Sequence, residues 1–344
     1  MKAVVFSEFG GTDRLELREV PTPTPAHGEV RVRVRAASLN HLDIWTRMGA
    51  FGGNIPLPHI GGCDAAGEVV AVGEGVTKFD VGDRVVVAPG IGCGHCEHCL
   101  RGHDSLCATY RVFGFTQQGG FAEYAVVEAR QLVGVGDALN YEEWASFGVA
   151  YLTAWHMLFT RARVRPGERV LVHAAGSGVG MAAIQLAVMA GARVFTTSAS
   201  DAKLERARGE LGAEATANYD TGDVAAAVRE WSEGAGVDVV IDHIGPATWQ
   251  TNLEVLRKGG RLVNCGVTSG PAIELQFRPV YARQISVLGS YLGDRHELES
   301  VLRMAEGGRL RPVIDRVFTL DKLAEAQDHM EGRGHFGKIV IRVP

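Results

Sequence analysis

The hydrophobic pattern of the chain changes near residue 166. Before that point, short Val-rich runs are separated by Gly, Pro and Asp turns, and in Glu29–Ala36 valine alternates with arginine. An alternation of period two is typical of a strand with one solvated face. The first part of the chain is therefore predicted to be rich in strands, at Lys2–Phe6, Glu29–Ala36, Gly67–Val72 and Arg84–Ala88.

From Pro166 onward, nearly continuous apolar runs alternate with segments of helical length. The predicted strands are Arg169–Ala174, Arg193–Thr197, Ala215–Ala217, Val237–Asp242 and Arg261–Cys265. The predicted helices are Val179–Ala190, Ala202–Leu211, Val224–Glu230 and Ala247–Leu256. Apolar strands that alternate with helices indicate a parallel sheet covered on both faces. This part is therefore expected to be a doubly wound, nucleotide-binding domain.

Composition and charge narrow the class of protein. The 344 residues suffice for two domains, and a formal charge of −5 gives no electrostatic reason to expect nucleic-acid binding. Ser7 and Glu8 interrupt the first apolar run, so it does not read as a signal peptide. The longest apolar helix candidate contains Gln185 and is too short to span a membrane. We therefore expect a cytoplasmic protein without membrane or nucleic-acid partners.

Four of the six cysteines lie in one run, GCGHCEHCLRGHDSLC, with the spacing C-x2-C-x2-C-x7-C. This spacing lets a small lobe near residues 92–108 present four thiolates to one point, as a structural zinc requires. The predicted ligands are Cys93, Cys96, Cys99 and Cys107. An iron–sulfur cluster is an alternative, although Ala108 stands where ferredoxins carry proline. Disulfides are a second alternative, but nothing else marks a secreted chain.

A glycine-rich turn follows the strand Arg169–Ala174. Ala175-Gly176-Ser177-Gly178-Val179-Gly180 lies where a G-x-G-x-x-G dinucleotide motif is expected, between the first strand and the first helix. Backbone N–H groups at the start of that helix would face a pyrophosphate. The predicted cofactor-binding residues here are Gly176, Ser177, Gly178 and Val179. A plain α/β domain with a glycine-rich turn remains the alternative.

The end of the second strand bears on the choice of dinucleotide. NAD enzymes place Asp or Glu there to bind the ribose hydroxyls. This chain has no carboxylate between Thr196 and Asp201, and instead offers the hydroxyl of Ser198 and the ammonium of Lys203. These groups would accept a 2′-phosphate, so NADP(H) is predicted over NAD(H). A solvated helix charge is the alternative interpretation of Lys203.

The order of these three parts resembles the zinc-containing medium-chain dehydrogenase/reductase superfamily over essentially the whole chain. The phrases Gly67-Glu68-Val69-Val70, Phe79–Val85 and Gly119–Tyr124 support the resemblance. It implies an α/β fold with a β-rich, GroES-like catalytic domain and a doubly wound Rossmann domain. We place the catalytic domain at 1–146 and 290–344 and the Rossmann domain at 147–289. The resemblance also implies that the four-cysteine zinc is structural.

Alcohol dehydrogenases of the superfamily carry a second, catalytic zinc. Its three ligand positions correspond here to Asn40, Cys63 and Val149, so that Cys63 with its neighbour Asp64 falls short of the three ligands an open zinc site needs. The chain is therefore similar to the quinone oxidoreductase branch. That branch shares the pattern Asn40-x-x-Asp43 and a phrase like Leu152–Trp155, and it binds the adenosine phosphate at positions corresponding to Lys203 and Tyr219. Quinone oxidoreductases generally lack the cysteine lobe.

We therefore expect an NAD(P)H-dependent oxidoreductase with a structural zinc and no catalytic zinc. Hydride would pass between the nicotinamide and a quinone, enone or other carbonyl substrate. The nicotinamide is expected near Thr153, Gly266 and Val267. The amide of Asn40 would stabilise charge on the substrate oxygen, with Asp43 orienting it.

Two alternatives remain open. One is a zinc-dependent alcohol dehydrogenase with a site rebuilt around Cys63 and Asp64, and the other is an NADPH-binding protein with little turnover. Small-molecule carbonyl, quinone or alcohol substrates are expected. A homodimer or homotetramer is also expected, and the run Gln284–Ser290 is a candidate edge strand for such pairing.

Overall fold

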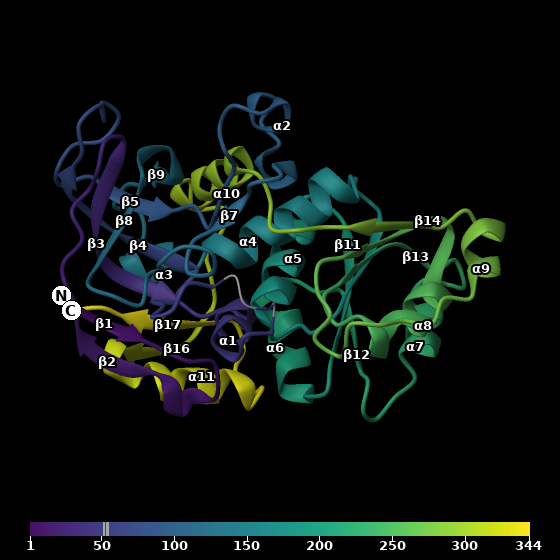
Figure 1. Cartoon of the computed structure of the whole chain (residues 1–344). Helices are drawn as coiled ribbons and strands as arrows, with labels where there is room; N and C mark the ends of the chain where they lie inside the picture. The colour runs from purple at the N-terminus through teal and green to yellow at the C-terminus, as the bar shows by residue number, and fades with distance from the viewer. Residues whose placement is uncertain (51, 53–54) are drawn as a thin grey trace. The chain divides into compact units, whose positions relative to one another are not determined.

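The computed structural model describes residues 1–50, 52 and 55–344. These residues form two compact units (Figure 1). The first unit comprises Met1–Leu152 and Gly293–Pro344, and the second comprises Thr153–Leu292. The domain boundaries expected from the sequence lie at 146/147 and 289/290, and as functional boundaries they stay a prediction. The predicted fold class, a β-rich part and a Rossmann-type parallel sheet, is confirmed.

The first unit is built mainly of strands. Its strands are β1 (Lys2–Val5), β2 (Glu16–Glu19), β3 (Glu29–Ser38), β4 (Asp64–Val72), β5 (Arg84–Val87), β6 (Gly90–Ile91), β7 (Arg111–Val112), β8 (Tyr124–Glu128), β9 (Leu132–Gly134), β16 (Ile314–Thr319) and β17 (Lys338–Arg342). Its helices are α1 (His41–Met48), α2 (Glu97–Leu100), α3 (Tyr141–Ala145), α10 (Arg295–Glu306) and α11 (Leu323–Glu331). Helix α4 (Gly148–Trp155) crosses the boundary at residue 152.

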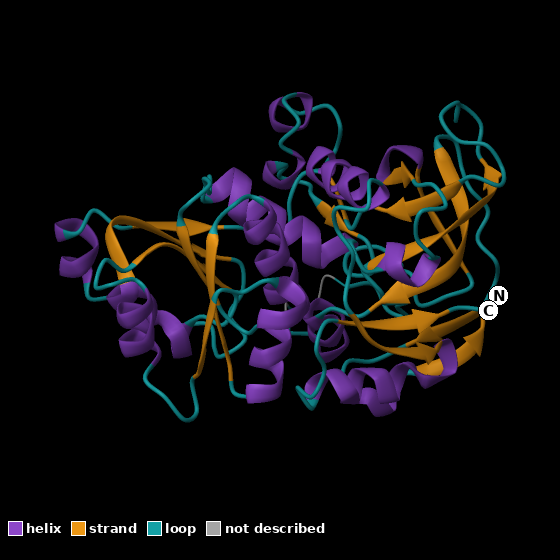
Figure 2. Cartoon of the chain, turned by 180° about the vertical axis from the view of Figure 1, so that it is seen from behind, coloured by secondary structure: helices purple, strands orange, loops and turns teal. Residues whose placement is uncertain are grey.

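Strand β3 organises the first unit. The main sheet has the order β16-β17-β3-β4-β5-β9, and β8 also pairs with β3. Val30, Val32 and Val34 are fully buried and the residues between them are partly exposed, as the alternation predicts. Strand β17 pairs antiparallel with β3, with Val340 opposite Ser38. Both chain ends therefore belong to this unit, and Figures 1 and 2 show them side by side.

The second unit is a doubly wound sheet. Its strands are β10 (Arg169–Val172), β11 (Arg193–Ser198), β12 (Ala215–Asn218), β13 (Val237–Asp242), β14 (Leu256–Asn264) and β15 (Ser286–Gly289). Its helices are α5 (Gly178–Met189), α6 (Asp201–Leu211), α7 (Val224–Trp231), α8 (Pro246–Val255) and α9 (Phe277–Ala282). A π-helical turn, His156–Arg161, follows α4.

All strands of this sheet are parallel, in the order β12-β11-β10-β13-β14-β15. Helices α5 and α6 cover one face and α7 and α8 cover the other, as both views show (Figures 1 and 2). Strand β14 begins at Leu256, five residues earlier than predicted from the sequence, because Leu256 pairs with Val237 of β13. Among the described residues, no helix is long and apolar enough to cross a membrane.

Candidate functional site

The four cysteines of the predicted zinc lobe lie together. The Sγ atoms of Cys93, Cys96, Cys99 and Cys107 are all within 4.8 Å of one another, and Cys93 Sγ is 4.0 Å from Cys99 Sγ. Zinc bonded tetrahedrally to sulfur at about 2.3 Å requires sulfur–sulfur separations of about 3.8 Å. All four thiols are free, so the disulfide alternative is not realised here. The donor set fits a closed tetrathiolate zinc.

The backbone of the lobe is shaped around these sulfurs. The N–H groups of Cys93 and Cys96 donate to Cys107 Sγ and Cys93 Sγ, each at 3.3 Å. A Cβ at Gly92 would lie 2.5 Å from Cys99 Sγ, so a side chain there would displace the sulfur. Hydrogen bonds from the Thr109 hydroxyl and the Cys93 N–H lower the pKa of Cys107 to about 6, which favours the thiolate form that binds metal.

A second polar cluster of the first unit surrounds Asp64, which begins β4. The Asp64 carboxylate accepts hydrogen bonds from Ser38 Oγ at 2.9 Å, Asn40 Nδ2 at 2.9 Å and the Val149 N–H at 2.7 Å. It also pairs with Lys338 Nζ at 3.1 Å. The exposed fractions of the Asp64 and Lys338 side chains are 0% and 2%, so this ion pair is buried. We name these residues the Asp64 cluster.

Lys338 reaches this cluster from β17. Its ammonium donates to the Leu39 carbonyl and to Asn40 Oδ1, both at 2.8 Å, in addition to Asp64. Three acceptors around one ammonium offset part of the cost of burying its charge. Sequence reasoning missed Lys338, because no local pattern links it to Asn40 and Asp64. These residues precede it by 298 and 274 positions in the chain. A lysine directly before the apolar run Ile339–Ile341 of the last strand was the available signal.

Asp43 lies beside this cluster in α1. Its carboxylate accepts the N–H groups of Asn40 at 2.7 Å, Gly62 at 3.1 Å and Cys63 at 3.0 Å, so it fixes the loop before β4 to the start of α1. Burial raises the pKa of Asp43 to about 6, although hydrogen bonds from the Asn40 N–H and the Cys63 thiol oppose the increase. Burial also raises the pKa of the Cys63 thiol well above its usual range. Cys63 is therefore a thiol, not a thiolate, at neutral pH.

The structure brings Asn40, Cys63 and Val149 to one place, as the resemblance implied. Asn40 is 9% exposed, and one proton of its amide goes to Asp64. Among the described residues, the groups able to hold a metal ion do not include Cys63 or Asp64. The Asp64 carboxylate is occupied by Lys338 and by three hydrogen-bond donors, which explains why it is not available as a ligand. The catalytic roles of Asn40 and Asp43 stay a prediction.

Two buried carboxylates of the first unit, Asp294 and Glu297, were missed by sequence reasoning. They form the capping box of α10, and Asp294 accepts the Ser105 N–H at 2.8 Å. Both are residue types that can bind a metal ion, but a helix-capping sequence carries no metal-binding motif.

In the second unit, the predicted dinucleotide residues follow the carboxyl ends of the strands. Ser177 is the N-cap of α5, and its Oγ accepts the Gly180 N–H at 2.9 Å. A Cβ at Gly180 would lie 2.2 Å from the Ala174 carbonyl oxygen, so the close approach of helix and loop requires glycine. Gly176, Gly178 and Val179 belong to the same turn, and Gly266 and Val267 follow β14. Thr153 is buried at the first position of the unit.

The residues predicted to bind the adenosine phosphate follow β11 and β12. Ser198 ends β11, Tyr219 follows β12 and is 51% exposed, and Lys203 lies in the first turn of α6. The nearby Asp201 carboxylate accepts a hydrogen bond from Asn218 Nδ2 at 2.8 Å. The closest acid to the end of β11 is thus already engaged by an amide.

Two histidines at these carboxyl ends were missed by sequence reasoning. His173 is 3% exposed and bonds Thr197 Oγ1 at 2.9 Å and Asn252 Oδ1 at 2.6 Å. Burial lowers the pKa of His173, although Asp242 and Asn252 oppose the decrease. His243 follows β13, and its Nε2 is 3.0 Å from Ser177 Oγ. Their positions directly after apolar strands were the signal that could have identified them.

Comparison with known proteins agrees with this arrangement. The family model "Alcohol dehydrogenase GroES-like domain" matches residues 26–137, and "Zinc-binding dehydrogenase" matches residues 178–307. An alcohol dehydrogenase of Geobacillus stearothermophilus is 31% identical, with all of both chains covered. A crystal structure of an NAD-dependent alcohol dehydrogenase shares 44% identity with a TM-score of 0.97, again over all of both chains. The cobalt- and zinc-bound alcohol dehydrogenase of Pyrobaculum aerophilum shares 37% identity over 99% of both chains, with a TM-score of 0.90.

These similarities correct one expectation. The interpretation as a quinone or enone reductase without a catalytic zinc is wrong: the two structures named above are alcohol dehydrogenases, one of them with bound cobalt and zinc, and the Geobacillus relative is an alcohol dehydrogenase as well. The expectation failed because it judged the second zinc only at Asn40, Cys63 and Val149. Ligand types elsewhere in the chain, such as Asp294 and Glu297, carry no local motif.

Taken together, the GroES-like and Rossmann parts, the cysteine lobe and full-length similarity to alcohol dehydrogenases identify the family. The chain is an enzyme that belongs to the zinc-containing medium-chain dehydrogenase/reductase superfamily.

Proposed function

We propose that the protein is a zinc- and nicotinamide-dependent alcohol dehydrogenase. The observation that carries this proposal is the 44% identity, over the whole chain, to an alcohol dehydrogenase described as NAD-dependent. The carboxyl ends of β10, β11, β13 and β14 supply the loops on which a dinucleotide binds in doubly wound sheets. The substrate class is therefore a small alcohol, or the corresponding aldehyde or ketone.

A bound nicotinamide would accept the hydride released when the carbinol C–H bond breaks, so that the alcohol would be oxidised to a carbonyl compound as the dinucleotide is reduced and the hydroxyl proton is lost to solvent. A catalytic zinc would supply Lewis-acid polarisation of the substrate oxygen. Asn40 contributes the second proton of its amide as a hydrogen-bond donor, and Asp43 holds the Asn40 backbone.

Activity is tested with the purified, metal-loaded protein on a panel of primary and secondary alcohols with NAD⁺ and NADP⁺. Nicotinamide absorbance reports reduction, and the same panel of aldehydes and ketones tests the reverse direction. Oxidation of at least one alcohol class supports the proposal. Reduction of quinones and enones with no reaction on any alcohol, aldehyde or ketone contradicts it.

The four-cysteine lobe is proposed to hold a structural zinc. It offers four sulfurs within 4.8 Å of one another, which is the donor set of closed zinc sites. Metal analysis of the intact protein and of C96S distinguishes this zinc from a second one. C96S is expected to lose one zinc per chain and to unfold at a lower temperature. An iron signal in place of zinc would identify the cluster alternative.

The dinucleotide is proposed to be NADP(H), held at its phosphate by Ser198, Lys203 and Tyr219. The absence of a free carboxylate at the end of β11 supports this choice, because Asp201 is bound to Asn218. The similar alcohol dehydrogenase is described as NAD-dependent, which favours the opposite choice. Fluorescence titration with NADPH and NADH decides between them, and K203A is expected to weaken NADPH alone. Tighter binding of NADH would overturn the preference.

Self-association and location complete the proposal. Strand β15 ends the sheet order, and the apolar side chains around it are exposed, with Phe277 and Tyr281 each at 62% and Val287 at 44%. An unpaired edge flanked by apolar surface favours pairing with a second copy. We expect a homodimer, or a homotetramer built from such dimers, in the cytoplasm. Light scattering of V287K tests the edge: a lower mass than the unsubstituted chain supports it, and an unchanged mass contradicts it.

A further inference from the structure

We propose that His243 is a binding residue for the dinucleotide, contacting the ribose–pyrophosphate part that NAD and NADP share. This inference rests on the proposed function, because it requires a nicotinamide dinucleotide at the carboxyl edge of the second unit. Neither the glycine-rich motif nor the residues predicted for the adenosine phosphate include this position.

The first step is the place of His243 in the sheet. The strand order β12-β11-β10-β13-β14-β15 reverses its direction of growth between β10 and β13. In doubly wound sheets, ligands bind outside the carboxyl ends of the strands at this switch point. Strand β10 ends at Val172 and β13 ends at Asp242, so Ser177 and His243 lie in the two loops that flank the switch point.

The second step is the contact across the switch point. His243 Nε2 is 3.0 Å from Ser177 Oγ. Because Ser177 Oγ accepts the Gly180 N–H, its own proton is free to be donated to His243 Nε2. Ser177 Oγ can therefore bond the Gly180 N–H and the His243 imidazole at the same time. A dinucleotide that lies across the switch point meets this imidazole directly.

The third step is the rigidity of the backbone that carries His243. The His243 carbonyl accepts from Thr268 Oγ1 at 3.3 Å, and the next N–H, of Ile244, donates to Asp242 at 2.7 Å. The Ile244 carbonyl accepts both the N–H and the hydroxyl of Ser269, at 3.0 and 2.7 Å. The loops after β13 and β14 are therefore joined, and only side-chain rotation is needed to move the imidazole from Ser177 to a ligand.

The contrast with His173 supports a role in binding. His173 is buried and both of its ring nitrogens are bonded within the protein, to Thr197 and Asn252, so it has a structural role. His243 is partly exposed, and its Nε2 is bonded to the hydroxyl of Ser177, which lies in the predicted cofactor loop. An imidazole in this position can offer a hydrogen bond to a ribose hydroxyl or a pyrophosphate oxygen.

The experiment is a pair of fluorescence titrations of the metal-loaded protein with NADH and NADPH. H243A is expected to weaken the binding of NADH and NADPH equally, by about tenfold, because a hydrogen bond to a charged group is lost. H243Q, which retains a donor, is expected to recover part of the affinity. Equal affinities in H243A and the unsubstituted protein, or a loss confined to NADPH, would overturn the proposal.

A double-variant cycle separates contact with the cofactor from support of Ser177. If His243 touches the cofactor, H243A still weakens NADH about tenfold in an S177A background. If His243 only positions Ser177, H243A has no further effect in that background, and the proposal fails. The melting temperature of each variant without cofactor shows whether folding is responsible, and a loss of affinity that merely follows a loss of folding also contradicts the proposal.

The outcome is distinguishable from failure of the proposed function. Alcohol oxidation with unchanged NADH affinity in H243A rejects the role of His243 and leaves the dehydrogenase proposal intact. Weakened NADH binding in H243A, together with no turnover of any alcohol by the unsubstituted protein, supports the role of His243 and rejects the dehydrogenase proposal. Failure of the unsubstituted protein to bind either dinucleotide rejects both.

Discussion

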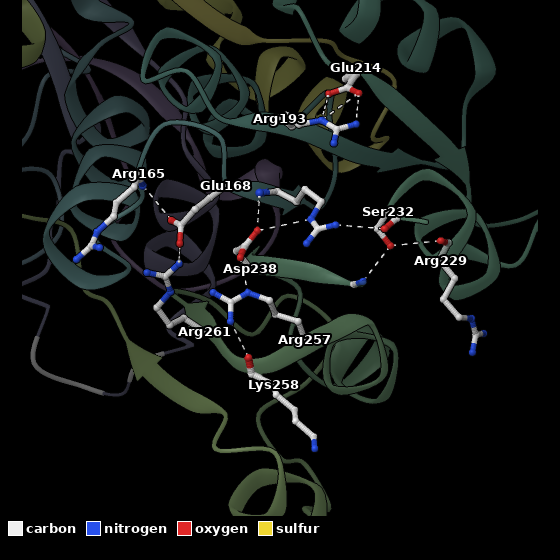
Figure 3. A network of polar contacts seen from close by, with 12 residues as sticks. Arg165, Glu168, Arg193, Glu214, Arg229, Ser232, Asp238, Arg257, Lys258 and Arg261 are labelled. Atoms are coloured by element: carbon white, nitrogen blue, oxygen red, sulfur yellow. Dashed lines mark hydrogen bonds and ion pairs between the residues drawn. The ribbon is translucent and has the colours of Figure 1, made fainter. Parts of the chain in front are cut away.

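The two ends of the parallel sheet in the second unit are both polar, but they are built from different interactions. At the amino end, arginines pair with carboxylates near the surface, Arg257 with Asp238 and Arg261 with Glu168 (Figure 3). Arg169 also pairs with Asp238. At the carboxyl end, His173 and Asn252 form a buried chain that ends on Asp242. The first arrangement holds the starts of strands, and the second supports the loops expected to bind a ligand.

Their access to solvent differs, and with it their sensitivity to substitution. The Arg257 and Asp238 side chains are 40% and 11% exposed, so water can replace part of a lost ion pair. Thr197, Asn252 and Asp242 are fully buried, so a lost partner leaves a polar atom without water. Charge alone is thus a poor guide to stability here, and burial of the hydrogen-bonding atoms decides the size of the effect.

The largest effect is expected for H173A. It removes hydrogen bonds to Thr197 and Asn252 and leaves a cavity, at a cost of about 3 kcal/mol in the free energy of unfolding. Denaturant titration measures this, and H329A, at a partly exposed histidine of the first unit, is the matched control. A loss below about 1 kcal/mol would show that the buried chain relaxes or admits water, and would remove the contrast between the two ends.

A smaller loss of stability, about 2 kcal/mol, is expected for D238A at the amino end. The substitution removes the acceptor of the Arg169 N–H, at 2.7 Å, and leaves Arg169 and Arg257 without their carboxylate. D238N keeps an acceptor and should lose about half as much. The affinity for NADH should stay within about twofold of the unsubstituted protein. A larger change in affinity would mean that the amino end also influences the ligand loops.

The pH dependence of folding should separate the two ends. The pKa of His173 is lowered by burial from its ordinary 6.5, so below that pH the unfolded chain binds a proton that the native chain refuses. Stability is therefore lost as the pH falls below about 6.5, by up to about 1.4 kcal/mol per pH unit. The loss in the free energy of unfolding between pH 6.5 and 5 should be smaller in H173Q than in the unsubstituted protein. If both proteins lose stability with the same slope, titratable groups other than His173 cause the loss.

The contribution of Asp238 to stability changes in a different, more acidic pH range. Burial would raise its pKa, but hydrogen bonds from the Arg169 N–H and Arg257 outweigh burial and lower the pKa below the ordinary 3.8. Its contribution is present above pH 3.8 and is lost as the pH falls through the lower native value. D238N should therefore leave the slope between pH 6.5 and 5 unchanged.

The smallest effect is expected for E214Q, also at the amino end. Glu214 accepts a forked pair of hydrogen bonds from Arg193 at 2.6 and 2.9 Å, but the two side chains are 43% and 47% exposed. We expect a change of about 0.5 kcal/mol at low salt that disappears at high salt, because exposed pairs are screened. Denaturant titration at two salt concentrations measures it. A loss of unfolding free energy as large as that of D238A would show that the exposure of an ion pair does not determine its contribution to stability.

Sequence periodicity was sufficient for the elements of this sheet but not for its polar contacts. The run Val237–Asp242 has the bounds of β13 as predicted, since an apolar strand is encoded locally. The cysteine lobe was also predictable, because its four ligands lie within 15 consecutive residues, Cys93 to Cys107. His173 and Asn252 are 79 positions apart, and only the parallel crossover brings them together. No local pattern encodes such a pair.

The same reasoning explains the error about the second zinc. The resemblance correctly led to Asn40, Cys63 and Val149 as neighbouring positions, and the structure gathers them near Asp43 and Asp64. It could not reveal that Lys338 neutralises Asp64, because that residue lies in the last strand. Nor could it weigh Asp294 and Glu297, whose helix-capping sequence is common in proteins without metal.

The position of Lys338 has a consequence for the order in which the protein folds during synthesis. Residues 153–292 form the second unit from one continuous segment, so that unit can complete its sheet while the ribosome is still translating the remainder. The first unit needs β17, and until residue 338 emerges Asp64 remains a buried-site carboxylate without its counter-ion. We expect ribosome-bound chains that stop before β17 to contain a protease-resistant second unit beside a protease-sensitive first one.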